Sequence, residues 1–269
     1  MNETTDLLKL PDATPAAVIG PKDIPDSNTM CVLLQTLMRG VNHQLFAQLG
    51  DRVRAGPFEG MQVPEQAPWA DGNAGCKMLG TYEHELHEVI ERAIERRPVG
   101  VINIGCAEGY YAIGLARRLD VNVYAYDIDE KSLRCAERYA ELNNVRDRVL
   151  TMHGLKPGDP FPYFSDRSLW IVDCEGDELK LLQPTPELEH ADIIVECHDF
   201  MLKPESSATI TEVLTGRFAG THSIERIKPS LPPLDCYATF AQSPAIMAVL
   251  AVIEKRPMPF TWLAMWANA

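Results

Sequence analysis

The segment at residues 99–110 constrains the fold of this chain more than any other. It begins with an apolar run that suits a parallel strand buried on both faces, and Gly105 and Gly109 then allow the backbone to turn closely past a ligand before a helix starts. About twenty residues after Gly105, a second expected strand, residues 121–126, ends at Asp127. An acid at that place can accept hydrogen bonds from both hydroxyls of a ribose. The pattern predicts a site for a nucleoside-containing cofactor.

The turn itself indicates which kind of cofactor. A dinucleotide site needs the pattern Gly-x-Gly-x-x-Gly, whereas this chain has Gly105-Cys106-Ala107-Glu108-Gly109, with an acid where a pyrophosphate would approach. Because the N-terminus of a helix favours anions, an acid already in the turn favours a ligand that is neutral or cationic nearby. S-adenosylmethionine carries an ammonium and a sulfonium but no phosphate, so it fits better than NAD. The alternative is a glycine turn that only packs the strand against the helix.

Composition narrows the class of protein. With 269 residues the chain can bury a full core, and its net charge of -13 without a cluster of Lys and Arg disfavours a nucleic-acid partner. The seven cysteines are scattered without metal-ligand spacing, as expected for reduced thiols. No signal peptide and no apolar run of membrane-spanning length is recognisable. We therefore expect a cytoplasmic protein with no membrane partner.

The chain divides into three expected parts. Residues 1–29 contain four prolines among polar residues and are expected to form a flexible N-terminal arm. Residues 30–80 are expected to form a helical extension and a Gly/Pro-rich loop over the ligand cleft. The helix covers residues 30–50, and its apolar positions are Val32, Leu33, Leu37, Val41, Leu45 and Leu49. It either roofs the site or pairs with its copy in a homodimer, and residues 81–269 form the main domain.

Strands and helices alternate along this domain, as in a doubly wound sheet of the α/β class. A first helix starts near Thr81 and ends before Pro98. The strands are expected at residues 100–104, 121–126, 148–152, 168–172 and 192–197, with helices at 109–118, 130–142, 176–182 and 205–216. A strand at 222–228, a helix at 245–255 and a strand at 260–267 follow. Because ligands bind beyond the carboxyl ends of parallel strands, the residues at those ends are the candidates for the site.

Three motifs give residues 80–200 a resemblance to a known family. Asn103-Ile-Gly-Cys-Ala-Glu-Gly-Tyr is similar to a turn that cradles the methionine end of the cofactor, and Val123-Tyr-Ala-Tyr-Asp127 is similar to the strand whose terminal acid holds the ribose. Asp173-Cys-Glu-Gly-Asp-Glu is similar to an Asp-x-Glu-Gly-x-Glu signature. With these motifs the chain resembles the class I S-adenosylmethionine-dependent methyltransferases, and most closely the FkbM-type group. The resemblance implies a Rossmann-like sheet of seven strands, the last one antiparallel.

The resemblance also implies which residues bind the cofactor. Asn103 replaces the family's usual acid, and Glu108 can supply the missing negative charge near the cofactor ammonium. Ile128 is expected beside the adenine, and Tyr82 precedes the first strand at a position that can close over the cofactor. The cofactor-binding set implied in this way is Tyr82, Asn103, Gly105, Cys106, Ala107, Glu108, Gly109, Asp127, Ile128, His153, Gly154 and Asp173.

Acidic side chains gather at the ends of two further strands. Asp173 and Glu175 follow one strand and are two residues apart, while Glu196 and His198 end the next. Asp173, Glu175 and His198 are therefore the candidate catalytic residues, acting as a general base with its supporting acids. Together with Glu196 they are alternatively the ligands of a divalent metal. A purely structural cluster is the third interpretation.

Several other residues receive structural interpretations. These are helix capping for Asp177 and Glu178, an exposed helix face for His84 and His87, and core packing for Trp262 and Trp266. Trp69 lies in the Gly/Pro-rich loop and is expected to touch the substrate.

Together these features predict an S-adenosylmethionine-dependent methyltransferase. The expected reaction is O-methylation of a small hydroxylated metabolite or sugar-like substrate by direct displacement, with general-base or metal assistance. N-methylation is the nearest alternative, and a non-catalytic module that binds the cofactor or a nucleoside is an alternative from another class. The broken glycine fingerprint disfavours an NAD-dependent oxidoreductase.

Overall fold

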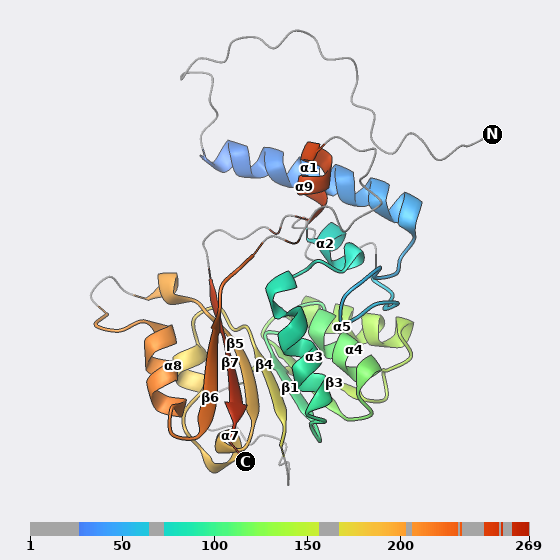
Figure 1. Ribbon diagram of the computed structural model, residues 1–269. Helices are drawn as coiled ribbons and strands as arrows, with labels where there is room; N and C mark the ends of the chain where they lie inside the picture. The colour runs from blue at the N-terminus through green and yellow to red at the C-terminus, as the bar shows by residue number, and fades with distance from the viewer. Residues whose placement is uncertain are drawn as a thin grey trace, which may run out of the picture.

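The computed structural model describes residues 27–64, 73–155, 167–202, 206–230, 232, 245–252, 254 and 260–268. Across these residues a seven-stranded sheet, with the strand order β3-β2-β1-β4-β5-β7-β6, forms the centre of the fold (Figure 1). The expected arm up to residue 26 and Trp69 lie outside the described residues. Residues 27–29, which the sequence places in the arm, instead begin the first helix.

Five neighbouring strands of the sheet are parallel: β1 (Val101–Ile104), β2 (Val123–Asp127), β3 (Val149–His153), β4 (Leu169–Val172) and β5 (Asp192–Cys197). The last strand, β7 (Thr261–Ala267), runs antiparallel to β5 and to β6 (His222–Ile227). Both β1 and β4 are buried along their whole length, as continuous apolar strands are when helices cover both faces. The expected doubly wound α/β sheet with an antiparallel last strand is confirmed.

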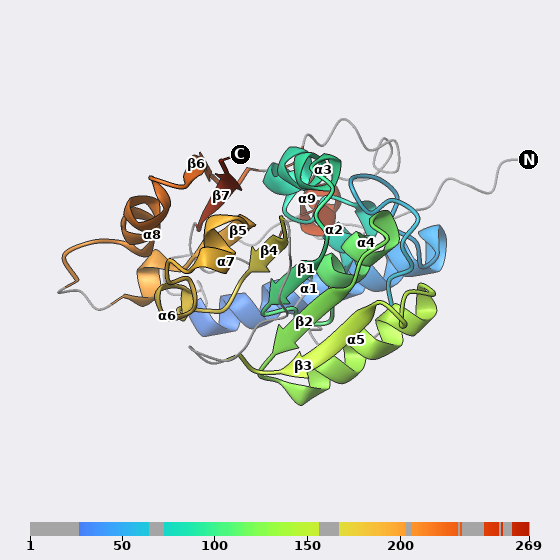
Figure 2. The same cartoon turned by 90° about the horizontal axis from the view of Figure 1, so that it is seen from below.

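Helices cover both faces of the sheet (Figure 2). On one face lie α3 (His87–Glu95), α4 (Tyr110–Arg118) and α5 (Glu130–Leu142), and on the other lie α6 (Glu178–Leu181), α7 (Pro186–Glu189) and α8 (Ile210–Phe218). Each face has its own hydrophobic core. Trp262 and Trp266 belong to the first core and are 1% and 2% exposed, which confirms their expected packing.

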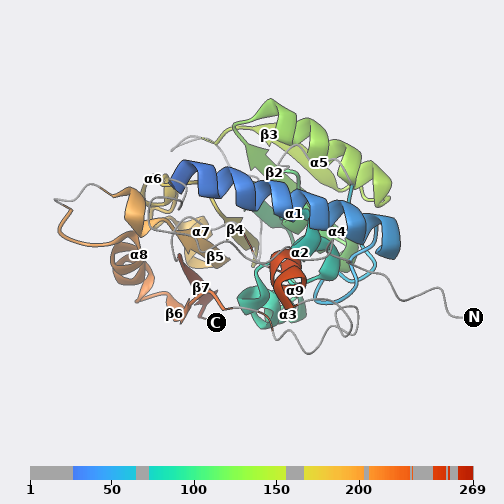
Figure 3. The same ribbon diagram turned by 90° about the horizontal axis from the view of Figure 1, so that it is seen from above.

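Three helices form a cap over the carboxyl ends of the parallel strands (Figure 3). The long α1 (Ser27–Leu49) runs across this end of the molecule, and α2 (Ala74–Leu79) and α9 (Ala245–Val252) pack against it. The shared core of this cap is formed by Met38, Val41, Leu45, Met78, Leu79, Leu250, Ala251 and Val252. The expectation of a loop over 56–80 is wrong for α2. The apolar residues of α2 are buried in the core of the cap, and this tertiary packing outweighs the Gly- and Pro-rich composition that favours a loop.

Only the second half of α1 is packed. Val41 and Leu45 are buried as expected, but Val32, Leu33 and Leu37 are 60%, 49% and 57% exposed. The apolar face is covered only where α2 and α9 meet the helix. A homodimer through α1 stays a prediction. None of the described helices is long and apolar enough to cross a membrane.

Most element boundaries lie within a few residues of those expected, and the larger shifts have local causes. The helix expected from Thr81 begins as a turn and a short 3-10 helix, η2 (His84–Leu86), before α3. The helix α8 begins at Ile210 rather than at the expected residue 205, because Thr209 and Glu212 form a capping box there. The Thr209 hydroxyl accepts from the Glu212 N–H, and the Glu212 carboxylate accepts from the Thr209 N–H. Two short elements, α7 and η3 (Asp199–Met201), have no counterpart among the expected elements.

Candidate active site

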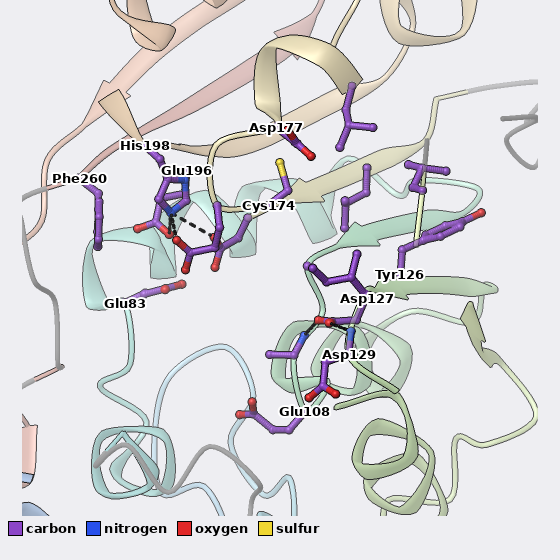
Figure 4. A pocket seen from close by; sticks show the side chains of 18 of the residues that line it. Glu83, Glu108, Tyr126, Asp127, Asp129, Cys174, Asp177, Glu196, His198 and Phe260 are labelled. Atoms are coloured by element: carbon purple, nitrogen blue, oxygen red, sulfur yellow. Dashed lines mark hydrogen bonds and ion pairs between the residues drawn. The ribbon is translucent and has the colours of Figure 1, made fainter. Parts of the chain in front are cut away.

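A pocket of about 490 Å³ opens at the carboxyl ends of β1, β2, β4 and β5. The segments after these strands line it together with α2 of the cap, and Figure 4 shows side chains converging on it from two sides. Its volume is in the range of small-molecule sites. The cofactor residues expected from the sequence that do line this pocket are Tyr82, Gly105, Ala107, Glu108, Asp127, Ile128, Gly154 and Asp173.

The turn after β1 starts in a conformation that favours glycine. Gly105 has a φ of +72°, and a Cβ built on it would lie 1.6 Å from the carbonyl oxygen of Asp173. The backbone N–H groups of Gly105 and Cys106 both donate to the carbonyl of Tyr126, each at 2.9 Å. The turn is thus fixed against the ends of β2 and β4, and it presents backbone to the pocket.

Asp127 ends β2 and faces the pocket (Figure 4). Its Oδ2 accepts a hydrogen bond from the Ala107 N–H at 2.9 Å, and its Oδ1 accepts one from the Asp129 N–H at 2.8 Å. Each carboxylate oxygen has a second acceptor position, so the fixed side chain can still receive hydroxyl groups of a ligand. The neighbouring Ile128 is 82% exposed and lines the same pocket. An apolar ring bound there would cover it.

Glu108 is not a lone charge in this pocket. Its side chain is 3% exposed and forms an ion pair with Lys77 of α2, whose ammonium lies 4.5 Å from the ring centre of Tyr82. The expected lone negative charge near a cofactor ammonium is therefore replaced by a positive and a negative group side by side. The pair also joins the cap to the turn after β1.

The remaining expected cofactor residues lie outside the pocket lining: Asn103, Cys106, Gly109 and His153. Asn103 is buried in β1, where its Nδ2 donates to the Ile171 carbonyl at 3.3 Å and its Oδ1 has no hydrogen-bond partner among the described residues. Cys106 is also buried, and burial raises the pKa of its thiol well above the usual value. These residues shape the strand and the turn. Their contact with a cofactor stays a prediction.

Four carboxylates surround the imidazole of His198 at the ends of β4 and β5. The ring Nδ1 is hydrogen-bonded to Oε1 of Glu178 at 2.5 Å. The ring Nε2 lies 3.4 Å from Oε2 of Glu175, 3.5 Å from Oδ1 of Asp173 and 3.7 Å from Oε2 of Glu196. The structure therefore brings together the four residues that the sequence singles out at these strand ends. His198 is buried, whereas the Glu175 side chain is 73% exposed.

Burial and the neighbouring charges shift the pKa values of Asp173 and His198. Burial raises the pKa of Asp173 to about 6, an effect that the charge of His198 opposes and that of Glu175 reinforces. Burial alone would lower the pKa of His198. The hydrogen bond to Glu178 and the neighbouring carboxylate charges outweigh burial, so this pKa lies above its usual value.

The interpretation of Glu178 as a capping residue is wrong. It begins α6, but its side chain is fully buried, and its Oε1 accepts from the Gly176 N–H at 3.1 Å and contacts the imidazole of His198. Asp177 makes no capping hydrogen bond either and instead pairs with Lys180. The Asp-x-Glu-Gly-x-Glu spacing, in which Glu178 is the third acid, is the signal in the sequence that identifies it.

Glu83 closes another side of the pocket in a way that no sequence pattern indicates. It has a φ of +46°, its carboxylate accepts from the Tyr111 hydroxyl, and its N–H donates to Oε1 of Glu254 at 2.8 Å. Glu83 and Glu254 are far apart in the sequence, so local periodicity does not connect them. Nearby, His84 and His87 are half-buried rather than exposed, with ring centres 4.9 Å apart.

Known proteins match part of the chain in sequence. Residues 80–160 match the family model described as ribosomal protein L11 methyltransferase (PrmA). A protein of that description from Lactobacillus helveticus is 27% identical over 73 residues, which are 26% of this chain and 23% of that protein. The match thus spans less than a quarter of that relative's length.

Two solved structures illustrate the likeness in fold. A geranyl diphosphate C-methyltransferase from Streptomyces coelicolor, in complex with Mg²⁺, geranyl-S-thiolodiphosphate and S-adenosyl-L-homocysteine, is 15% identical with a TM-score of 0.47, over 94% of this chain and 99% of that one. A ribosomal protein L11 methylase from Lactobacillus delbrueckii subsp. bulgaricus is 20% identical with a TM-score of 0.42, over 69% and 80% of the two chains.

The strand order and the family match agree on the fold. The sheet has seven strands and its last strand, β7, is antiparallel, as the class I resemblance implies. The matched residues 80–160 contain the turn at 105–109 and Asp127. The chain therefore has the Rossmann-like fold of the class I S-adenosylmethionine-dependent methyltransferases.

Proposed function

We propose that the protein is an S-adenosylmethionine-dependent methyltransferase that methylates a hydroxyl group of a small molecule. The observation that carries this proposal is the make-up of one pocket, with Asp127 and the turn at 105–109 on one side and the carboxylates around His198 on the other (Figure 4). The first side suits the cofactor, and the second suits a nucleophile that must release a proton. The Asp-x-Glu-Gly-x-Glu spacing supports an assignment to the FkbM-type group.

The cofactor side of the pocket fits S-adenosylmethionine better than a dinucleotide. Asp127 is held with acceptor positions ready for the ribose hydroxyls, and the exposed Ile128 provides an apolar surface for the adenine. Lys77 and Glu108 present charges that complement the carboxylate and the ammonium of an amino acid. When bound, S-adenosylmethionine supplies a methyl group on a positively charged sulfur.

The other side of the pocket can hold the nucleophile and accept its proton. A hydroxyl that attacks the methyl group must lose its proton, and carboxylates close to an imidazole are suited to receive it. Asp173 and His198 line the same pocket as Asp127, so nucleophile and methyl donor can be aligned in one enclosed space. Because the reaction is a single displacement, this alignment is the main task of the protein.

A small hydroxylated or sugar-like molecule is the substrate class that we propose. The carboxylates of the cluster accept hydrogen bonds from hydroxyls, and the rings of Phe200 and Phe260 lie beside His198, with centres 5.9 Å and 5.3 Å away. These rings would pack against the carbon skeleton of such a molecule. The family match ends at residue 160, before β4 and the cluster, so it supports the cofactor half and carries no argument for a ribosomal protein as substrate.

A methyl-transfer assay with radiolabelled S-adenosylmethionine and a panel of hydroxylated small molecules tests this proposal. We expect Asp173→Asn and His198→Gln to lose turnover while they retain binding of S-adenosylhomocysteine. His190→Ala, an exposed histidine outside the pocket lining, is the control and should retain both. A wild-type protein that binds S-adenosylhomocysteine but methylates nothing would favour the non-catalytic module. Full turnover in both cluster variants would contradict the role of the cluster.

A further inference from the structure

The atoms around Nε2 of His198 are arranged like the ligands of a divalent cation. The carboxylate oxygens of Glu175, Asp173 and Glu196 lie 3.4, 3.5 and 3.7 Å from Nε2, and the ligand atoms of Asp173, Glu196 and His198 all lie within 4.8 Å of one another. Ligands that share a divalent cation at about 2.0–2.2 Å are separated by roughly 3.0–3.5 Å. The distances from Nε2 to the three carboxylate oxygens need only a small contraction to reach that range.

Hydrogen bonds to Nε2 of His198 do not account for the three oxygens around it. Glu178 accepts from Nδ1, so in the neutral ring Nε2 carries a lone pair that points at further acceptors. In the protonated ring, Nε2–H would be expected to hold one carboxylate at about 2.7–2.9 Å, yet the three oxygens surround it at 3.4–3.7 Å. The buried Oδ1 of Asp173 has no hydrogen-bond partner among the described residues. A cation would satisfy Nε2 and this oxygen together.

The surroundings of His198 match those of a metal-binding histidine. Such a histidine almost always gives its other ring N–H to a carboxylate, a backbone carbonyl or a water molecule, which fixes the tautomer and turns the free nitrogen toward the metal. Glu178 does this here from a side chain that is 0% exposed. The ring of Phe260 lies beside the imidazole, at 5.3 Å between ring centres. The four carboxylates around one imidazole also leave an excess of negative charge in the cluster.

We propose that Asp173, Glu196 and His198 bind a divalent first-row transition-metal ion, with Glu178 as the positioning residue that holds the imidazole. One nitrogen and two carboxylate ligands favour Mn²⁺ or a similar ion over Mg²⁺ and Ca²⁺, which prefer oxygen ligands alone. The site deepens the proposed function and, in its catalytic role, depends on it, because Asp173, Glu196 and His198 line the pocket that would hold the substrate hydroxyl.

The role of the ion in methyl transfer is to hold the substrate hydroxyl and acidify it. The hydroxyl proton passes to Glu175, the exposed carboxylate of the cluster, and from there to water. The alkoxide oxygen forms a bond to the methyl carbon while the bond from that carbon to the cofactor sulfur breaks. The negative charge of the alkoxide and the positive charge of the sulfonium cancel, which leaves an ether and a neutral thioether.

Binding of Mn²⁺ alone to the metal-stripped full chain tests the site without any turnover. We expect titration calorimetry to show one Mn²⁺ per chain, and pulsed electron paramagnetic resonance to show the nitrogen of a directly bound imidazole. His198→Gln should abolish the nitrogen signal, and Asp173→Asn should weaken binding at least tenfold. Glu178→Gln should weaken it about 10- to 100-fold and alter the nitrogen coupling, because the imidazole is no longer held by a charged carboxylate.

Matched controls separate metal ligation from general damage. His190→Ala and Glu187→Gln change exposed residues of the same types and should leave the affinity for Mn²⁺ unchanged. Each variant is also titrated with S-adenosylhomocysteine, which reports an intact fold. No binding of Mn²⁺, or binding without the imidazole signal, would overturn the metal site even if S-adenosylhomocysteine still binds. Binding of Mn²⁺ with no binding of S-adenosylhomocysteine would support the site and contradict the proposed function instead.

Discussion

Replacing Gly105 by Ala should disrupt the contact that joins the two sides of the pocket. A Cβ at this position would lie 1.6 Å from the carbonyl oxygen and 2.7 Å from the carbonyl carbon of Asp173, where real Cβ contacts are essentially never below 3.0 Å. Both atoms belong to the backbone, so no side-chain rotation relieves the overlap. The end of β1 and the start of the Asp173 segment would have to move apart by more than an ångström.

The free-energy cost of this substitution has two parts. Ala in the left-handed region at φ +72° costs about 1–2 kcal/mol relative to glycine. Forcing extra volume into a packed site costs about 1–3 kcal/mol more. We therefore expect Gly105→Ala to lower the free energy of unfolding by about 2–5 kcal/mol. It should also weaken binding of S-adenosylhomocysteine, because the displaced turn carries the Ala107 N–H that Asp127 binds.

Gly154→Ala is the matched control for this experiment. Gly154 also lies in the pocket lining at a positive φ of +59°, but a Cβ built on it has nothing within 4 Å. Gly154→Ala should lower the free energy of unfolding only by the conformational cost, about 1–2 kcal/mol, as measured by urea unfolding monitored with circular dichroism. If Gly105→Ala is no more destabilising than Gly154→Ala, and the two variants bind S-adenosylhomocysteine with equal affinity, then the close contact between Gly105 and Asp173 does not hold the turn in place.

Three further predictions follow from other contacts. Asp127→Asn should weaken binding of S-adenosylhomocysteine about 10- to 100-fold in calorimetry, because the amide cannot accept hydrogen bonds from both the Ala107 and the Asp129 N–H. The control Asp120→Asn changes an exposed residue and should not weaken binding, and an unchanged affinity in Asp127→Asn would contradict the assignment of Asp127 to the cofactor site. Arg96→Ala should lower the free energy of unfolding by about 1–3 kcal/mol, because the 1% exposed carboxylate of Asp192 loses its bidentate partner and keeps Arg167 at 3.7 Å and the Ala267 N–H at 3.0 Å. An unchanged free energy of unfolding would be evidence against this. Burial lowers the pKa of His222, so the stability that the neutral side chain contributes is fully present above the usual histidine pKa and is lost as the pH falls through the lowered pKa of the folded state. The free energy of unfolding of His222→Asn should therefore fall less than that of the wild type between pH 7.5 and pH 5, and equal losses would count against the lowered pKa.

The sheet could be predicted from the sequence because its signals are local. In β1 and β4 the strand residues form continuous buried runs, and each ends at a turn whose residues differ sharply from the strand. Asp127 was identifiable because its place at the end of β2 depends only on the strand boundary. The cluster around His198 was identifiable for the same reason, since β4 and β5 are neighbours and their carboxyl ends meet.

The parts that the sequence did not predict depend on contacts between distant residues. By its place at the start of a helix, Glu178 is indistinguishable from an acid that caps the helix, and only the fold shows that it contacts His198. The pairing of Glu108 with Lys77 requires α2, a short helix in a segment whose composition indicates a loop. The first half of α1 has the same apolar periodicity as the second half, and only the position of α2 and α9 decides which half is buried.

The most direct test of the whole account is a calorimetric titration of the wild-type chain with S-adenosylhomocysteine, with NAD titrated under the same conditions. We expect one binding site for S-adenosylhomocysteine with an affinity in the micromolar range, and no binding of NAD. Asp127 would then serve a nucleoside without phosphates, as the acidic turn at 105–109 indicates. Binding of NAD with no binding of S-adenosylhomocysteine, or binding of neither, would contradict the methyltransferase proposal.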